Sequence, residues 1–139
     1  TIGTASDLFL SHHLLNSRLV KTMDANLSIH GISFTEYQVL YQLSQAAGRS
    51  LSRIDLARSV ELSASGVTRL ISPMEKLGMV KKEKHPRDAR KSLVKLSEAG
   101  LRIFEESSVT FDNISKTLFG SLSESQMAKM DQLCSRVSR

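Results

Sequence analysis

The sequence has little of the material that several classes of protein require. Its 139 residues include one cysteine, two prolines and no tryptophan. A single thiol cannot form an internal disulfide framework, and it cannot build a zinc site without several partners elsewhere. No apolar run approaches the roughly 18 residues that a transmembrane helix needs, and the N-terminus lacks the basic and then apolar segments of a signal peptide. These absences favour a soluble, cytoplasmic protein with no membrane partner.

Motifs typical of enzymes are also missing. The chain has no glycine-rich loop that could cradle a phosphate and no cluster of His, Asp and Glu at metal-ligand spacing. Cys134 has no plausible histidine partner for nucleophilic catalysis, and it lies on an apolar helical stripe, so we expect a buried, inert thiol. The sequence therefore predicts no catalytic residues, no metal and no cofactor.

Positive charge is concentrated in one segment. The chain carries a net charge of +5, and residues 79–95 contain seven Lys and Arg residues against two acids, which accounts for all of it. The rest of the chain is therefore close to neutral. A concentrated basic segment favours a polyanionic partner. The alternative is a solvated hairpin whose lysines keep an edge strand from aggregating.

Two helices are predicted before the centre of the chain. Apolar residues at helical spacing indicate a long amphipathic helix that runs from about residue 8 to a stop at His30. Ser33 and Glu36 then form a capping box, in which each side chain can bond a free backbone N–H at a helix start. This box predicts a second helix over residues 34–46.

A helix-turn-helix is predicted next. A short helix begins at Ser52, and a tight turn at residues 61–63 leads into a fourth helix that Ser63 caps and Gly78 ends. Two short helices joined in this way are typical of the motif. Pro73 lies inside the fourth helix and removes one backbone hydrogen bond, so we expect either a bend beyond the N-terminal turns or a break just before the proline.

The remaining segments complete a mainly α fold with a small β-hairpin wing. Residues 79–96 read as a hairpin, and two further helices follow it, capped by Ser97 and Ser123. The apolar stripes of the outer helices lie outside the central unit and need a partner. We therefore divide the chain into a dimerisation helix, a winged helix-turn-helix lobe and two more dimerisation helices, which form one compact unit. These segments are residues 1–32, 33–96 and 97–139.

The start of the fourth helix carries the residues expected at a DNA-reading surface. Small and hydrogen-bonding side chains let the backbone approach phosphates and let side chains reach base edges. Arg69 could bond guanine in a bidentate manner. In the alternative interpretation these residues are caps and ordinary exposed polar groups. The candidates are Ser63, Ser65, Gly66, Thr68 and Arg69.

The hairpin carries a second group of candidates. Basic side chains around its turn would reach the DNA backbone or the minor groove, where arginine is favoured. Asp88 is unexpected there, because phosphates repel a carboxylate. It either holds Arg90 or a neighbouring arginine in place, or it caps its own turn. The basic candidates are Lys84, Arg87, Arg90 and Lys91.

The linked motifs resemble one family. The segment LSRIDLARSVELSASGVTRLISPMEKLGMV followed by RDARKSLVKLSEAG resembles the MarR family of bacterial winged-helix regulators, and GISFTEYQVLYQL is similar to its second helix. Asp88-Ala89-Arg90 resembles the family's wing signature. Pro73 departs from the commonest family pattern.

This resemblance implies a homodimer that binds a near-palindromic operator in double-stranded DNA. Its recognition helices would enter successive major grooves and its wings the flanking minor grooves. Ser65, Thr68 and Arg69 would occupy base-reading positions, Arg90 would be the wing-tip arginine, and Asp88 would orient basic side chains. The alternative function is a winged helix used for protein contact or for nonspecific nucleic-acid architecture.

The resemblance also implies a small-molecule effector. Many members of the family are repressors that small aromatic acids or phenols release from DNA, bound between the dimerisation helices and the DNA-binding lobe. His12, His13 and Arg18 on the first helix are candidates to hold such an acid. The alternative is a surface or dimer-interface role for these residues.

Overall fold

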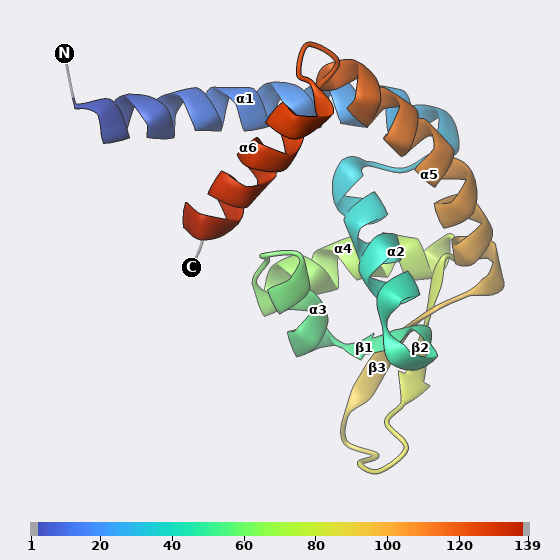
Figure 1. Ribbon diagram of the computed structural model, residues 1–139. Helices are drawn as coiled ribbons and strands as arrows, with labels where there is room; N and C mark the ends of the chain where they lie inside the picture. The colour runs from blue at the N-terminus through green and yellow to red at the C-terminus, as the bar shows by residue number, and fades with distance from the viewer. Residues whose placement is uncertain (1–2, 138–139) are drawn as a thin grey trace.

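The computed structural model, drawn in Figure 1, describes residues 3–137. Helices α2, α3 and α4 and a small sheet form one lobe, α1 and α5 pack together beside it, and α6 extends from the end of α5 as a separate arm. The mainly α fold with a β-hairpin wing is therefore confirmed. The elements are α1 Thr4–Leu27, η1 Ser28–His30, α2 Phe34–Gln45, η2 Ala47–Arg49, β1 Ser50–Ser52, α3 Arg53–Ser59, α4 Ala64–Lys76, β2 Val80–Lys84, β3 Ser92–Leu96, α5 Glu98–Leu118 and α6 Glu124–Val137.

Serine side chains cap the helices of the lobe, as the sequence predicts. At the start of α2, Ser33 Oγ accepts the Glu36 N–H at 3.1 Å, and the Ser33 N–H donates to Glu36 Oε1 at 2.8 Å. Ser52 and Ser63 accept in the same way at α3 and α4. Each cap satisfies a backbone donor that a helix start leaves free. The caps therefore fix where each helix of the lobe begins.

The core lies between α2, α3, α4 and the inner face of the sheet. Its fully buried side chains come from all of these elements, and their burial supplies the main stabilisation of the lobe. Stacked aromatic rings connect the lobe to α5, with the Tyr37 and Phe111 centroids 4.5 Å apart and Tyr37 Oη 2.8 Å from Ser108 Oγ. Burial raises the pKa of Tyr37 above its usual 10.0. The fully buried core residues include Leu40, Leu43, Leu56, Ile71, Met74 and Val94.

The sheet has three antiparallel strands in the order β1-β3-β2. The β2–β3 hairpin pairs Val80 with Leu96 at its base and Lys84 with Ser92 near its tip. Strand β1 was not expected from the sequence, because its three residues are too few for an alternating pattern. It pairs with β3 and so anchors the base of the wing to the helix-turn-helix.

Gly100 sits where the wing base meets α5. Ser97 Oγ–H is shared between the carbonyl oxygens of Gly78 and Met79 at 2.5 and 2.9 Å, which holds the first turn of α5 against the segment between α4 and β2. A Cβ added at Gly100 would collide with the Met79 carbonyl and lie 2.9 Å from a Leu96 methyl. There is therefore no room for any side chain at this position.

We expect Gly100→Ala to lower the free energy of unfolding by about 1–3 kcal/mol, because one methyl group would force the backbone of the wing base to move. Denaturant titration followed by circular dichroism measures this change. An unchanged denaturation midpoint would show that the backbone of the wing base can move without a loss of stability.

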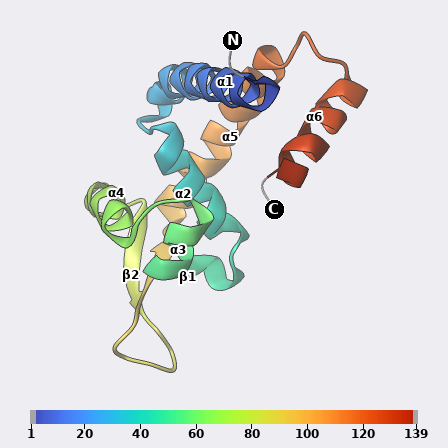
Figure 2. The same cartoon turned by 90° about the vertical axis from the view of Figure 1, so that its left-hand side faces the viewer.

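The outer helices expose apolar side chains. Leu8, Phe9, Leu10 and Leu14 of α1 are between 53% and 74% exposed, and none of the described residues of α6 is buried. Cys134 is exposed, so the expected buried thiol is wrong for the single chain. The reason is that α6 stands apart from the other elements (Figure 2), so the described residues of its apolar stripe are not buried. Among residues 3–137, no helix has the apolar length that crossing a bilayer requires.

Candidate nucleic-acid interface

Helix α4 divides into a buried face and a polar face. Val67, Ile71 and Met74 are fully buried against the core, whereas Thr68 and Arg69 are exposed. The helix continues through Pro73, so a break at the proline is ruled out. The polar side chains predicted to read DNA are therefore presented together on the outer side of one uninterrupted helix.

The first turn of α4 is organised by its cap. Ser63 Oγ accepts the Gly66 N–H at 3.1 Å and lies 3.2 Å from Ser65 Oγ. A Cβ on Gly66 would lie only 3.2 Å from Ser63 Oγ, so the glycine makes room for the cap. Ser63 and Gly66 thus have a structural task as well as the position expected of phosphate-approaching residues.

Thr68 and Arg69 follow one turn later. Thr68 Oγ1 donates to the Ala64 carbonyl at 3.1 Å, and because the residue is exposed its oxygen can still accept a hydrogen bond from outside the chain. Arg69 is exposed and forms no ion pair with any part of the chain that the structure describes. Its guanidinium is therefore available for an external acceptor.

An ion pair joins the two helices of the motif. Arg53, at the start of α3, lies 3.4 Å from Glu75 near the end of α4, and both side chains are about one quarter exposed. Partial burial holds the two side chains of such a pair in one geometry more firmly than open solvent does. It ties the start of α3 to the end of α4.

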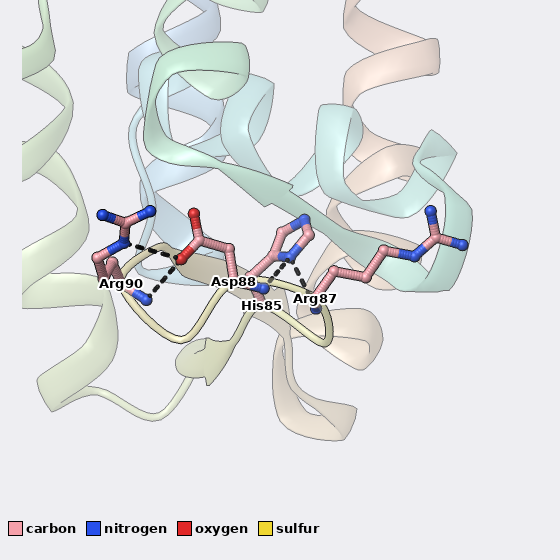
Figure 3. Close-up of polar contacts among 4 residues, drawn as sticks. All are labelled: His85, Arg87, Asp88 and Arg90. Carbon is pink, nitrogen blue, oxygen red and sulfur yellow. Dashed lines mark hydrogen bonds and ion pairs between the residues drawn. The ribbon is translucent and has the colours of Figure 1, made fainter.

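The wing tip is built around Asp88, as Figure 3 shows. Asp88 Oδ1 accepts the backbone N–H of Arg90 at 3.0 Å and the Arg90 Nε–H at 3.3 Å. Both interpretations of this acid are therefore correct, because one oxygen caps the turn and holds the arginine. The Arg90 N–H first, and then its guanidinium, lower the pKa of Asp88 below the usual 3.8. The carboxylate is thus charged throughout the neutral range.

The basic side chains of the wing remain open to solvent. The Arg90 side chain is 92% exposed although Asp88 contacts it. Arg87 and Arg90 extend to opposite sides of the tip (Figure 3). Lys95 pairs with Glu83 at 3.3 Å across the two strands, so these two charges largely cancel. The candidates Lys84, Arg87, Arg90 and Lys91 are all exposed.

His85 is a wing residue that sequence reasoning missed. Its Nδ1 accepts the backbone N–H groups of Arg87 and Asp88 at 3.1 and 3.2 Å. The backbone N–H of His85 donates to the Lys91 carbonyl at 3.2 Å, and the backbone N–H of Lys91 donates to the Asp88 carbonyl at 3.0 Å. The signal in the sequence was its spacing, because His85 precedes Asp88 by three residues, as the capping serines precede their donors.

The predicted effector residues are not among those that line the apolar cavity beside α1. His12, His13 and Arg18 are exposed on α1. A cavity of about 160 Å³ lies nearby, where α1 and α5 meet the start of α2, and other side chains line it. Its lining residues are Asn16, Leu19, Val20, Met23, Phe34, Phe111, Ser115, Leu118 and Phe119.

A family model and a curated relative both match this chain. The model of the MarR family matches residues 30–91. An uncharacterised HTH-type transcriptional regulator of Bacillus subtilis strain 168, YhbI, is 23% identical over 136 residues, which cover 98% of this chain and 87% of that protein. These matches include both the helix-turn-helix and most of the wing.

Solved structures share the fold. A mutant of MarR from Escherichia coli, complexed with operator DNA, superposes with a TM-score of 0.87 at 23% identity, covering 94% of this chain and 93% of that one. The organohalide-sensing transcriptional regulator RdhR, in its 2,4-dichlorophenol-bound form, superposes with a TM-score of 0.89 at 18% identity, covering 99% and 80%. At these identities the likeness establishes the winged-helix architecture.

Proposed function

We propose that this chain, whose residues 30–91 match the model of the MarR family, is a homodimeric, sequence-specific DNA-binding repressor of that family. The observation that carries the proposal is the pairing of two open surfaces on one lobe. One is the polar face of α4, and the other is a wing tip in which Asp88 holds a 92% exposed Arg90. Its place of action is then the bacterial cytoplasm, where the DNA lies.

The two surfaces would divide the work of recognition. Ser65, Thr68 and Arg69 would meet base edges in the major groove, which carries a distinct pattern of donors and acceptors for every base pair. Arg90 would enter the flanking minor groove, whose negative potential favours arginine. The other candidates would contact the backbone, where bonds fix register without reading sequence. These are Ser63, Gly66, Lys84, Arg87 and Lys91.

The exposed apolar side chains of α1 and α6 support the dimer. An apolar surface of this kind is unusual on a monomer and marks an interaction site. A second copy of the chain would bury both helices by twofold symmetry, and it would also cover Cys134. A dimer places two α4 helices on one duplex, which matches a near-palindromic operator. The apolar residues are Leu8, Phe9, Leu10, Leu14, Met127, Leu133 and Val137.

The cavity between α1, α2 and α5 supports the effector. Its aromatic and aliphatic walls suit a small phenolic or aromatic ligand, and Asn16 and Ser115 supply hydrogen-bonding groups. It touches both the dimerisation helices and the first helix of the DNA-binding lobe, so a ligand there could change how the two lobes of a dimer are spaced. The dichlorophenol-bound relative is consistent with this class of ligand. His12, His13 and Arg18 lie outside this lining and are exposed.

The alternative is nonspecific nucleic-acid architecture, and one experiment separates the two. The affinity of the purified protein for a random duplex pool, and for the pool enriched by repeated binding, is measured between about 50 and 200 mM salt. Specific binding predicts that enrichment raises the affinity by about a thousandfold or more. A steep salt dependence without that gain would support the architectural function instead.

The direction in which Asp88→Ala changes the affinity for DNA distinguishes two roles for this acid. If the acid only repelled phosphates, Asp88→Ala would bind DNA more tightly. We expect instead a loss of roughly three- to tenfold in affinity for the enriched DNA, because both bonds to Arg90 disappear. Asp88→Asn is the matched control, since its amide oxygen can still accept the Arg90 N–H. Its affinity for the enriched DNA should fall between those of wild type and Asp88→Ala. Fluorescence anisotropy titrations measure all three proteins, and tighter binding by the alanine variant would contradict the positioning role.

A further inference from the structure

We propose that His85 is a positioning residue for the wing, and that it acts only as a neutral imidazole with its proton on Nε2. Protonation of the ring would then loosen the wing tip and weaken its contact with DNA. The effect on the tip follows from the hydrogen bonds alone, whereas the effect on DNA rests on the proposed function.

The geometry of His85 is that of a cap. Each capping serine of this chain accepts the N–H three residues ahead, and His85 Nδ1 accepts the N–H of Asp88 at that same offset. It also accepts the N–H of Arg87, the first donor available after Pro86, which has no N–H. The wing tip thus uses a ring nitrogen where the helices use a hydroxyl.

Accepting these bonds constrains the protonation state. Two N–H groups point at one nitrogen, so Nδ1 must offer its lone pair, and the ring proton of the neutral form must sit on Nε2. In the imidazolium form both nitrogens are donors, and the Nδ1 proton would face two backbone N–H groups. Both bonds would break, and the tip would lose its hold on Arg87 and Asp88.

The consequence reaches Arg90 through Asp88. Asp88 Oδ1 holds the Arg90 backbone and side chain, and the Lys91 N–H closes the turn onto the Asp88 carbonyl. The backbone of Asp88 is itself fixed by His85. Loss of that bond would therefore release the arginine that is proposed to enter the minor groove.

The other charges around His85 belong to the wing. Lys84, Arg87, Asp88 and Lys91 are its charged neighbours along the hairpin, and Figures 1 and 2 show the tip extending away from the remaining elements. Asp88 stays ionised well below neutral pH, because Arg90 lowers its pKa. Histidine is the side chain whose ordinary charge change falls between pH 5 and 8, so the experiments compare pH 8 with pH 5.5.

The structural part is tested without DNA. Two-bond proton–nitrogen correlation spectra of the full chain identify which ring nitrogen of His85 carries the proton, and assignment comes from His85→Asn. We expect the Nε2–H form at pH 8, and we expect the amide signals of Arg87 and Asp88 to move with the titration of the ring. An Nδ1–H form at pH 8, or amides that ignore the titration, would overturn the proposal.

The functional part uses two variants that differ in the acceptor they provide. Asparagine at residue 85 can accept the same N–H groups and does not titrate, whereas His85→Ala removes the acceptor. Affinities for the enriched DNA are measured at pH 8 and at pH 5.5. We expect wild type to match the asparagine variant at pH 8 and to fall toward the alanine variant at pH 5.5, by about three- to tenfold.

Two outcomes would overturn the functional part. If wild type and His85→Asn showed the same pH dependence, the histidine would not be the titrating group, since all other histidines are retained in both. If wild type bound more tightly at pH 5.5 relative to His85→Asn, added positive charge would outweigh positioning. If selection gave no DNA that wild type or either variant bound, but the spectra showed the Nε2–H form and the expected amide shifts, the proposed function would be wrong. The capping role of His85 would still be supported.

Discussion

Phe9→Asp is expected to convert the proposed dimer into monomers and to lower the affinity for the proposed operator by about 10²–10⁴-fold. Phe9 is 74% exposed on α1 in the single chain, among other apolar residues. In the proposed dimer a charge at this position would be buried without a partner, which would cost more than the interface gains there. The affinity falls because a dimer holds two half-sites at once and a monomer holds one.

Light scattering after size-exclusion chromatography gives the mass, and anisotropy titration gives the affinity. Phe9→Leu is the control, because it keeps an apolar side chain and should remain dimeric. Circular dichroism shows whether the lobe stays folded, which we expect because Phe9 lies outside the core. A Phe9→Asp protein that remained dimeric and bound the operator normally would show that the outer part of α1 is not the interface.

Arg69→Ala is expected to cost about 1–3 kcal/mol of operator binding and to relax the sequence requirement at one position of each half-site. Its guanidinium has no ion pair within the described residues and stands on the open face of α4. The reason for the expected loss is that the proposed bidentate bond from Arg69 to guanine would read one base pair.

Arg69→Lys separates base reading from simple attraction to phosphates. Lysine keeps the charge but lacks the planar fork of arginine. If Arg69 reads a base, the lysine variant should also lose selectivity while its salt dependence stays near that of wild type. If Arg69 contacts only phosphate, the lysine variant should bind the same sequences as wild type, and the base-reading role would be contradicted. Binding to operators substituted at each position measures the difference.

The sequence predicted those parts of the fold that local chemistry decides. Ser33, Ser52, Ser63 and Ser97 mark helix starts because a hydroxyl at a cap meets donors three residues away, and that spacing is visible in the sequence. The buried face of α4 was visible for the same reason, as a helical repeat. The hairpin was predicted by its proline and its β-rich return strand.

Parts that depend on distant contacts were not predictable. Strand β1 exists because β3 offers it an edge, and three residues carry no pattern of their own. The cavity forms where α1, α2 and α5 meet, so its lining residues could not be chosen from α1 alone, and His12 and His13 lie elsewhere. Cys134 was expected to be buried because its stripe is apolar, but burial also needs a partner surface, which the single chain does not supply.

The wing lies between these two cases. The sequence posed two roles for Asp88 as alternatives, and the structure combines them in one oxygen. The role of His85 went unnoticed because histidine is not among the residues usually associated with capping, although its spacing to Asp88 matches that of a cap. The proposed wing contact therefore depends on two acceptors, a carboxylate and a ring nitrogen.

The central claim, sequence-specific binding by a dimer, is tested most directly by selection of bound sequences from random duplex DNA with the purified protein. One enriched motif is expected, with two inverted half-sites whose centres lie one helical turn apart, about 10–10.5 base pairs. A single dimer is expected to protect both half-sites. A selection that enriches no motif, or one that enriches a single unrepeated site, would contradict it.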